Sequence, residues 1–379
     1  MLDLSAATAA YREMTGHAPA GLWSSPGRVN LIGDHTDYND GLALPAAIDR
    51  SAVVAAGLRA DAMIRCRSRQ VPTEVRVALD DIGRGSEDGW ALPVLGALWG
   101  LRRAGVGVPG IDLTIDSTIP MGGGLASSAA LGVATALAMT ELTGQHLSDS
   151  DVARCCQDGE GSIAGAPTGL MDQLAVLAGR TGYAVFLDCR TLERELVPFR
   201  PGEVALSLVV IDTSVAHSNR GGGYRARREE SAQAAGVLGV HSLRDATLDD
   251  VEGRLSGMLQ RRARHVLTEN ARVRRTVELL RDGRVQAIGG VLEESHASLR
   301  DDYEVSSPEL DAAVAAAHDA GAWGARMTGA GLGGCAIALV PSYAREKVAE
   351  AVRESFARQG FRAPTVFDVT TADGARRCG

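Results

Sequence analysis

Apolar runs that predict strands dominate the first part of the chain, and they follow a short helical opening. Runs with few charges, or with alternating polar positions, are typical of buried and half-buried strands, and they occupy residues 22–29, 42–58, 73–79 and 111–115. Helical spacing at residues 90–103 and an Ala-rich stretch at residues 124–142 predict two helices. We therefore expect strands to precede these helices and to alternate with them.

A second region of mixed pattern begins near residue 200. The sequence VALSLVVID, at residues 204–212, predicts a buried strand, and residues 198–202 just before it favour a turn suited to a domain junction. Charged helices are expected at residues 226–238, 255–282 and 308–320, followed by a Gly-rich loop and a strand at residues 335–340. Because 379 residues exceed the usual span of one hydrophobic core, we predict two domains, residues 1–200 and 201–379.

Composition and charge favour a folded protein that binds a small molecule. Hydrophobic residues make up 45% of the chain and charged residues 23%, which is ordinary for a globular protein. The formal net charge of -8 argues against broad electrostatic binding to nucleic acid or to an anionic membrane. A locally basic pocket for phosphates remains compatible with this charge.

The cysteines and the N-terminus give no sign of export. The six cysteines show neither C-x-x-C spacing nor clustering with histidines, so neither a zinc site nor a disulfide framework is indicated. Asp3 and Glu13 lie where a signal peptide would be basic and then apolar, and we expect a cytoplasmic protein with reduced thiols. The uncharged stretch at residues 117–140 contains Pro120 and three successive glycines, so we interpret it as a loop leading into a buried helix.

The first segment with candidate chemistry is SPGRVNLIGDHTDYNDG, at residues 25–41. Between its turn-forming Gly and Asn residues lie the polar side chains of Arg28, Asp34, His35 and Asp37. Carboxylates and a histidine form several directed hydrogen bonds with hydroxyl groups, which is how a site distinguishes a polyol from its epimers. The pattern indicates a site for a ligand rich in hydroxyl groups. A solvated loop with Asx-turns is the alternative that these residues alone leave open.

The second segment is PMGGGLASSAALG, at residues 120–132. Glycines allow close approach of the backbone, and the free N–H groups and dipole at a helix N-terminus favour negative charge, so the segment predicts a phosphate-binding loop. It is not a Walker loop, because no Lys-Ser or Lys-Thr follows the glycines. A tight turn before a well-capped buried helix is the alternative.

Two further segments are weaker signals by themselves. RMTGAGLGGCAIALV, at residues 326–340, is a Gly-rich turn leading into a strand, and it either braces a nucleotide site or simply connects two elements. Asp172 begins a helical pattern after a loop that contains Gly and Pro. Its carboxylate either faces a cleft or caps its own helix, and the cap is the commoner role for an isolated Asp.

Together these segments resemble the galactokinase branch of the GHMP kinases, the small-molecule kinases that include homoserine, mevalonate and phosphomevalonate kinases. Residues 120–132 and 326–340 carry the motifs of the superfamily, and residues 25–41 are close to the galactokinase signature. Further matches lie in RRARHVLTE and SHASLRDDYEVSSPELD, at residues 261–269 and 295–311. The resemblance implies two mixed α+β domains, the first of ribosomal S5 type and the second ferredoxin-like, with a cleft between them.

The resemblance also assigns roles at the reacting end of the substrate. Arg28 and Asp172 match the catalytic pair, with Asp172 near the anomeric hydroxyl of galactose as a base or orienting group and Arg28 stabilising charge. The positions that match those holding the sugar hydroxyls are Asp34, His35, Asp37, the backbone at Gly169, and Tyr224. This chemistry fits phosphoryl transfer, which asks the protein for positioning and electrostatic stabilisation.

ATP is the implied co-substrate, and Mg²⁺ is the implied metal ion. The positions that match the loop around the nucleotide phosphates are Pro120, Gly122, Gly123, Gly124, Leu125, Ser127 and Ser128. Ser128 and Glu160 match positions near the magnesium ion. No partner chain is implied, and a monomer is favoured.

Three positions depart from the family pattern. Asp34 stands where Glu is usual, Thr168 where Cys is usual, and Ala330 where Gly is frequent. The Asp34 carboxylate is shorter by one methylene at a position that contacts the carbon-6 hydroxyl. We therefore expect weaker discrimination against 6-deoxygalactose, or against arabinose, than a Glu would give.

Two other functions compete with galactose phosphorylation. One is a related kinase that acts on another sugar such as arabinose. The other is a non-catalytic sensor of galactose and ATP, as some galactokinase relatives act on transcription machinery. Those relatives have a damaged phosphate loop, whereas Ser127, Ser128 and Ala129 are present here together with Arg28 and Asp172.

Overall fold

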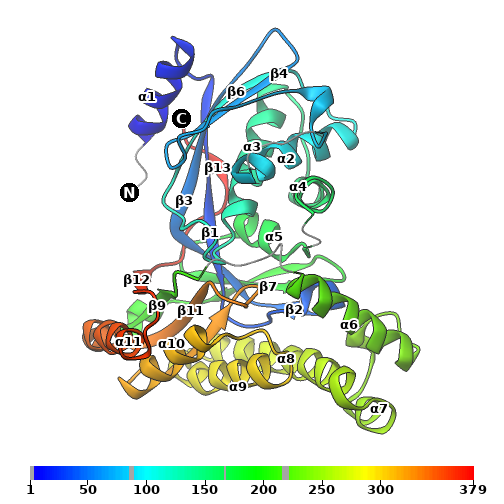
Figure 1. Cartoon of the computed structure of the whole chain (residues 1–379), viewed down its shortest axis with the longest axis vertical. Helices are drawn as coiled ribbons and strands as arrows, with labels where there is room; N and C mark the ends of the chain where they lie inside the picture. Colours follow the sequence, from blue (N-terminus) through cyan, green and yellow to red (C-terminus); the bar gives the residue numbers. More distant parts are fainter. Residues whose placement is uncertain (1–3, 85–88, 166–167, 216–221) are drawn as a thin grey trace.

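The described strands of the chain form three sheets, and helices pack on these sheets (Figure 1). The computed structural model describes residues 4–84, 89–165, 168–215 and 222–379. This mixture of helix and sheet confirms the predicted α+β class. All neighbouring strands are antiparallel except β4 and β6, which are parallel.

The largest sheet has six strands in the order β13-β1-β3-β6-β4-β5. In chain order these strands are β1 (Gly21–Asn30), β3 (Pro45–Leu58), β4 (Met63–Ser68), β5 (Val75–Ala78), β6 (Ile111–Ser117) and β13 (Arg376–Arg377). The register between β1 and β3 shifts after Pro26, because Asp49 and Arg50 of β3 have no partner in β1. The shift lies directly before Gly27 and Arg28.

Helices cover both faces of this sheet. On one face lie α2 (Leu92–Arg103), α3 (Ser127–Leu142), α4 (Asp149–Ile163) and α5 (Met171–Ala178), and on the other lies α1 (Leu4–Thr15) (Figure 1). The apolar side chains between α2, α3 and the sheet are fully buried, among them Trp23, Leu98 and Val133. Gly100 and Gly159 let α2 and α4 approach so closely that a Cβ at either residue would overlap the other helix's backbone.

A second sheet has four strands in the order β10-β11-β9-β12. These are β9 (Leu206–Asp212), β10 (Gly324–Thr328), β11 (Cys335–Pro341) and β12 (Thr365–Val369). Its helices are α6 (Gly223–Leu238), α7 (Leu248–Arg254), α8 (Gly257–Arg281), α9 (Ile288–Asp301), α10 (Pro308–Asp319) and α11 (Arg345–Gln359). A third, small sheet lies between the two halves in Figure 1 and contains β2 (Leu42–Ala43), β7 (Tyr183–Asp188) and β8 (Arg194–Pro198).

The two halves of the chain share one hydrophobic core. Val29 and Ile48 of the first sheet lie in the same buried cluster as Leu208, Val273 and Ile337 of the second half. The C-terminal strand β13 also returns to pair with β1. The division into residues 1–200 and 201–379 stays a prediction, and residues 376–377 belong to the first sheet.

Most elements expected from the apolar pattern are present, with ends shifted by a few residues. The strand expected at residues 204–212 is β9, and the expected Ala-rich helix is α3, which begins at Ser127 because residues 120–126 form the loop. All six cysteines are free, as predicted. Of the helices in the described ranges, none is long and apolar enough to cross a membrane.

Candidate active site

Arg28 and Asp172 form a bidentate ion pair. Arg28 lies in β1 and Asp172 in the first turn of α5; the Arg28 Nε donates to Asp172 Oδ1 at 2.8 Å and Nη2 donates to Oδ2 at 2.7 Å. Only 4% of the Arg28 side chain is exposed, against 27% of Asp172. The N-cap position of α5 is Leu170, so the Asp172 carboxylate is bound to Arg28 instead of serving as the N-cap. A held but accessible carboxylate is the arrangement that a base or orienting group needs.

The same guanidinium group holds the Gly-rich loop between β6 and α3. Arg28 Nη1 donates to the carbonyl oxygen of Gly124 at 2.5 Å, and the Arg28 backbone N–H donates to the carbonyl of Leu125 at 3.1 Å. Gly122 and Gly124 have φ values of 73° and 75°, in the left-handed region that favours glycine. No side chain caps α3 at Ala126, so its first N–H groups are available to an anion.

The residues predicted to surround the nucleotide phosphates all lie in this loop or in the first turn of α3. They are Pro120, Gly122, Gly123, Gly124, Leu125, Ser127 and Ser128. Ser128 is exposed, whereas Leu125 packs into the shared core. Their contacts with a nucleotide stay a prediction.

Asp37 lies against Gly169 in the segment that precedes α5. A Cβ at residue 169 would stand 1.9 Å from Asp37 Oδ2, so any other residue there would displace the Asp37 carboxylate. Burial, together with the nearby Asp172 carboxylate, raises the pKa of Asp37 to about 7. The structure thus brings together Asp37, Gly169 and Asp172, as the resemblance implied.

His35 is held through both of its ring nitrogens. Burial lowers the pKa of His35 to about 3, so the ring is neutral. Because a carbonyl only accepts, Nε2–H donates to Ala330 O at 3.1 Å and Nδ1 accepts from the Tyr38 hydroxyl at 2.9 Å. The Tyr38 oxygen in turn accepts from Tyr303, and the Tyr303 oxygen accepts from Ser231. For a ring nitrogen of His35 to bind a sugar hydroxyl, as predicted, one of these two hydrogen bonds would have to be exchanged for a bond to the sugar.

Tyr224 joins this aromatic group from the first turn of α6. Its ring centroid lies 5.6 Å from that of His35 and 5.3 Å from that of Tyr38. Burial raises the pKa of Tyr224 well above its usual value, and Asp37 and Asp172 add to this effect, so the hydroxyl stays protonated. A protonated phenol beside two carboxylates can donate to, and accept from, a substrate hydroxyl.

Glu160 is buried in α4 and oriented by two donors. Thr168 Oγ1 and Gln173 Nε2 donate to Glu160 Oε2 at 3.0 Å and 2.9 Å. Burial and the Asp172 carboxylate raise the pKa of Glu160 to about 7. Thr168, which stands where the family pattern has Cys, therefore supplies a hydroxyl that holds Glu160.

Asp34 lies deeper than the residues around it. Its Oδ2 accepts from Arg326 Nη2, and its Oδ1 accepts from the backbone N–H of Gly329 at 3.1 Å. Only 1% of Asp34 and none of the Arg326 side chain is exposed. Burial raises the pKa of Asp34, and the Arg326 guanidinium opposes that rise. The predicted contact of Asp34 with the sugar stays untested, and both carboxylate oxygens already have protein donors.

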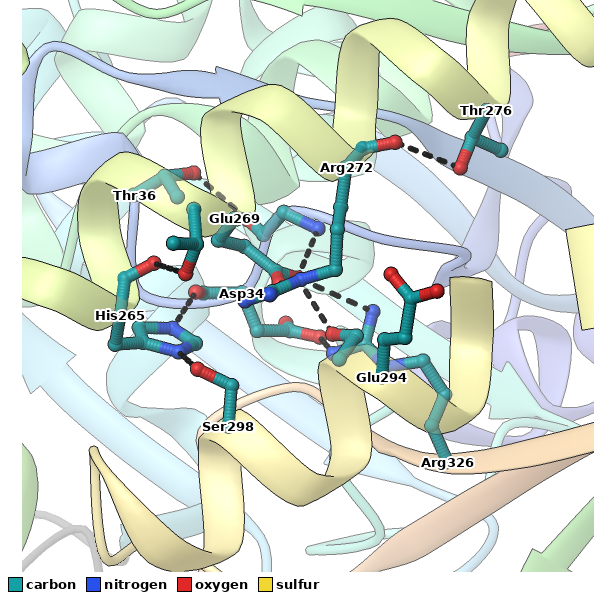
Figure 2. A network of polar contacts seen from close by, with 12 residues as sticks. Asp34, Thr36, His265, Glu269, Arg272, Thr276, Glu294, Ser298 and Arg326 are labelled. Carbon is teal, nitrogen blue, oxygen red and sulfur yellow. Dashed lines mark hydrogen bonds and ion pairs between the residues drawn. The ribbon is translucent and has the colours of Figure 1, made fainter. Parts of the chain in front are cut away.

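Next to Asp34 lies a polar network in which side chains of α8 contact residues 31–42 (Figure 2). Glu269 Oε1 accepts from the Gly33 N–H at 2.9 Å and from Ser295 Oγ at 2.7 Å, while Oε2 accepts from Arg272 Nε at 2.7 Å. Although burial raises the pKa of Glu269, the guanidinium groups of Arg272 and Arg326 bring it down to about 2. Glu269 is therefore ionised inside the protein.

Two further α8 side chains bind the backbone of the same segment. His265 Nε2 donates to the carbonyl of Asp34 at 3.1 Å, and Asn270 Oδ1 accepts from the Leu42 N–H at 2.8 Å. Buried backbone groups need partners, and one face of α8 supplies them here. Sequence reasoning missed this role, although the spacing of His265, Glu269 and Asn270 on one helical face was a usable signal.

Comparison with known families agrees with this geometry. The model of the galactokinase galactose-binding signature matches residues 9–58. The models of the GHMP kinase N-terminal and C-terminal domains match residues 93–180 and 276–358. The first match contains β1 and residues 31–42, and the second contains the Gly-rich loop and α5.

Named relatives cover almost the entire chain. A galactokinase of Streptomyces coelicolor is 45% identical over 97% of this chain and 96% of its own length. A galactokinase of Mycobacterium tuberculosis is 41% identical over 94% of this chain and 99% of its own length.

Solved structures give the same answer. The Lactococcus lactis galactokinase complexed with galactose superposes with a TM-score of 0.94 at 31% identity, over 100% of both chains. The Methanococcus jannaschii mevalonate kinase shares the fold, with a TM-score of 0.64 at 17% identity over 93% of this chain and 98% of its own. With the fold, the order of the motifs and these relatives in agreement, the chain belongs to the galactokinase family of the GHMP kinases.

Proposed function

We propose that the protein transfers the γ-phosphoryl group of ATP to the anomeric hydroxyl of galactose, giving galactose 1-phosphate. The observation that carries this proposal is the bidentate Arg28–Asp172 pair, whose guanidinium group also binds Gly124 of the Gly-rich loop. One side chain thereby sets the distance between a carboxylate and the phosphate loop. Such positioning is the main contribution that a protein makes to phosphoryl transfer.

Asp172 orients the anomeric hydroxyl and accepts its proton as the new bond to phosphorus forms. Its partly exposed carboxylate is anchored at both oxygens, so its approach to a hydroxyl is fixed in advance. Arg28 stabilises the negative charge that develops during transfer. Asp37, the backbone at Gly169, and Tyr224 surround the same carboxylate and hold the remaining sugar hydroxyls.

The side chains around Asp172 suit a magnesium ion. Burial first, and the Asp172 carboxylate second, raises the pKa values of Asp37 and Glu160 to about 7, and a cation nearby would favour the ionised form of both. Mg²⁺ prefers oxygen ligands and takes few from protein when phosphates supply the others. Within the described ranges, no group of three His, Cys, Asp or Glu side chains could hold a metal ion alone. Ser128 and Glu160 would hold the ion, which would neutralise phosphate charge.

A coupled ADP-release assay across a panel of monosaccharides tests this function. We expect release with galactose in the presence of ATP and Mg²⁺, with turnover on the order of 1 to 100 per second. Chelation of Mg²⁺ should abolish it. Release with arabinose or another monosaccharide but not with galactose would overturn the proposed substrate. The absence of ADP release with every sugar of the panel would favour the non-catalytic sensor.

A further inference from the structure

We propose that Asp34 is a positioning residue that ties residues 31–42 to the turn after β10, and that it is not a ligand of the sugar. This inference rests on the proposed function, because it concerns the sugar site. It assigns a role to the one residue of residues 25–41 whose carboxylate lies beyond the reach of solvent.

Exposure separates Asp34 from the carboxylates that face the substrate. Only 1% of Asp34 is exposed, whereas 27% of the Asp172 side chain is. A substrate hydroxyl must reach a carboxylate oxygen to within ordinary hydrogen-bond distance. In this structure Arg326 and the Gly329 N–H occupy the two oxygens of Asp34 instead.

The partner of Asp34 is itself fixed from several directions. Arg326 Nη1 donates to the carbonyl of Leu31 at 2.9 Å and lies 3.9 Å from Glu269 Oε1. Two carboxylates, Asp34 and Glu269, thus accompany the guanidinium groups of Arg326 and Arg272 in the network of Figure 2. A buried charge set that is balanced in this way holds its members in place.

The turn after β10 connects this pair to both halves of the active site. Gly329, which donates to Asp34, packs so that a Cβ would lie 3.0 Å from the carbonyl oxygen of Gly124. The next residue, Ala330, accepts from His35. Asp34 therefore holds a turn that touches the Gly-rich loop on one side and the sugar segment on the other. Its loss should disturb every substrate alike.

Asp34→Asn, assayed with galactose and with analogues that each lack one non-anomeric hydroxyl, tests the proposal. The substitution keeps the size of the side chain and removes its charge. We expect kcat/KM to fall about tenfold to a hundredfold, as for removal of a charge-assisted hydrogen bond. The fall should be the same for galactose and for every analogue, including 6-deoxygalactose. A residue that binds one hydroxyl would instead leave kcat/KM unchanged for the analogue lacking it, and that result overturns the proposal.

Asp40→Asn is the matched control. Asp40 lies in the same segment, but its carboxylate pairs at the surface with Arg190, and kcat/KM should change less than about fivefold. Should Asp34→Asn fail to fold, Arg326→Lys receives the same panel, because it keeps the charge and removes the forked donor. The same uniform fall is expected.

Hydrogen exchange gives a readout that needs no substrate. In Asp34→Asn, amides of residues 31–42 and of residues 329–334 should exchange faster than in the native protein, because the charged side chain that connects the two segments is gone. Unchanged exchange in both segments would overturn the positioning role. If the native protein fails to phosphorylate galactose, the proposed function falls while the exchange comparison still decides this inference.

Discussion

Two arginine–carboxylate pairs of the same chemistry lie in opposite surroundings. Arg28 and Asp172 meet at the edge of the site, where 27% of the Asp172 side chain is exposed. Arg326 and Asp34 meet inside the protein, with side-chain exposures of 0% and 2%. The first pair is open to solvent and the second is not, although both lie within the segments that resemble galactokinase motifs.

Charge balance separates the two regions further. Around Asp172, burial and like charge raise the pKa values of Asp37 and Glu160 to about 7. Around Arg326, burial also raises the pKa of Asp34, but the guanidinium groups of Arg272 and Arg326 outweigh burial at Glu269 and bring its pKa down to about 2. A cluster of like charges can be neutralised by a bound ligand of opposite charge, whereas a cluster whose charges are already paired needs no ligand. The comparison therefore assigns chemistry to the first region and positioning to the second.

The largest expected effect on stability comes from unbalancing the buried region. Glu269→Gln leaves Arg272 with an amide in place of its carboxylate, and the free energy of unfolding should fall by about 3 to 5 kcal/mol. Denaturant unfolding measures this. Glu294→Gln is the control on the neighbouring helix, since the Arg275–Glu294 pair is more than half exposed and should be worth at most about 1 kcal/mol. Equal decreases in the free energy of unfolding in the two variants would show that the buried charges stabilise the protein no more than a surface ion pair does.

The next largest effect is on catalysis. Asp172→Asn should lower kcat at least about a hundredfold with the fold retained, because a neutral amide cannot accept the proton. Asp151→Asn is the control: it also removes a first-turn carboxylate, from the exposed start of α4. Near-normal activity of Asp172→Asn would show that the Asp172 carboxylate takes no part in the transfer.

A smaller effect concerns the pH dependence of stability. The pKa of Asp37 in the folded protein, about 7, lies above its ordinary value of 3.8, so the folded state binds more protons between these limits. Its contribution to the free energy of unfolding therefore falls as pH rises from about 4 to about 7. Asp37→Asn lacks this loss, and its stability relative to the native protein should grow over that window by on the order of 1 to 3 kcal/mol. If the free energy of unfolding changed with pH in the same way in both proteins, the pKa of Asp37 would not be raised by folding.

Local patterns predicted the scaffold well, because strands and apolar helices have periodic sequences. The continuous apolar run became β9, and the Ala-rich stretch became α3. By contrast, α4 and α9 were not predicted, although their buried residues recur at helical spacing. Arg28 and Asp172 lie in segments far apart in the chain, and only the resemblance paired them before the structure did.

The buried network could not be predicted from the sequence in the same way. α8 is rich in arginine and glutamate, and such a helix is typical of a solvated surface. Whether Glu269 faces solvent or Arg326 depends on how the second half of the chain packs on residues 31–42. For Asp34, the family pattern predicted a sugar contact, which stays a prediction, and its contact with Arg326 became visible only in the packed structure.

Identification of the product tests the central claim most directly. The native protein, incubated with galactose, ATP and Mg²⁺, should give a product whose phosphorus couples to the proton on the anomeric carbon in a phosphorus–proton correlation spectrum. That result would identify the anomeric hydroxyl as the acceptor of the phosphoryl group. Phosphate on any other hydroxyl of galactose, or ADP formation without a phosphorylated sugar, would contradict the proposed reaction.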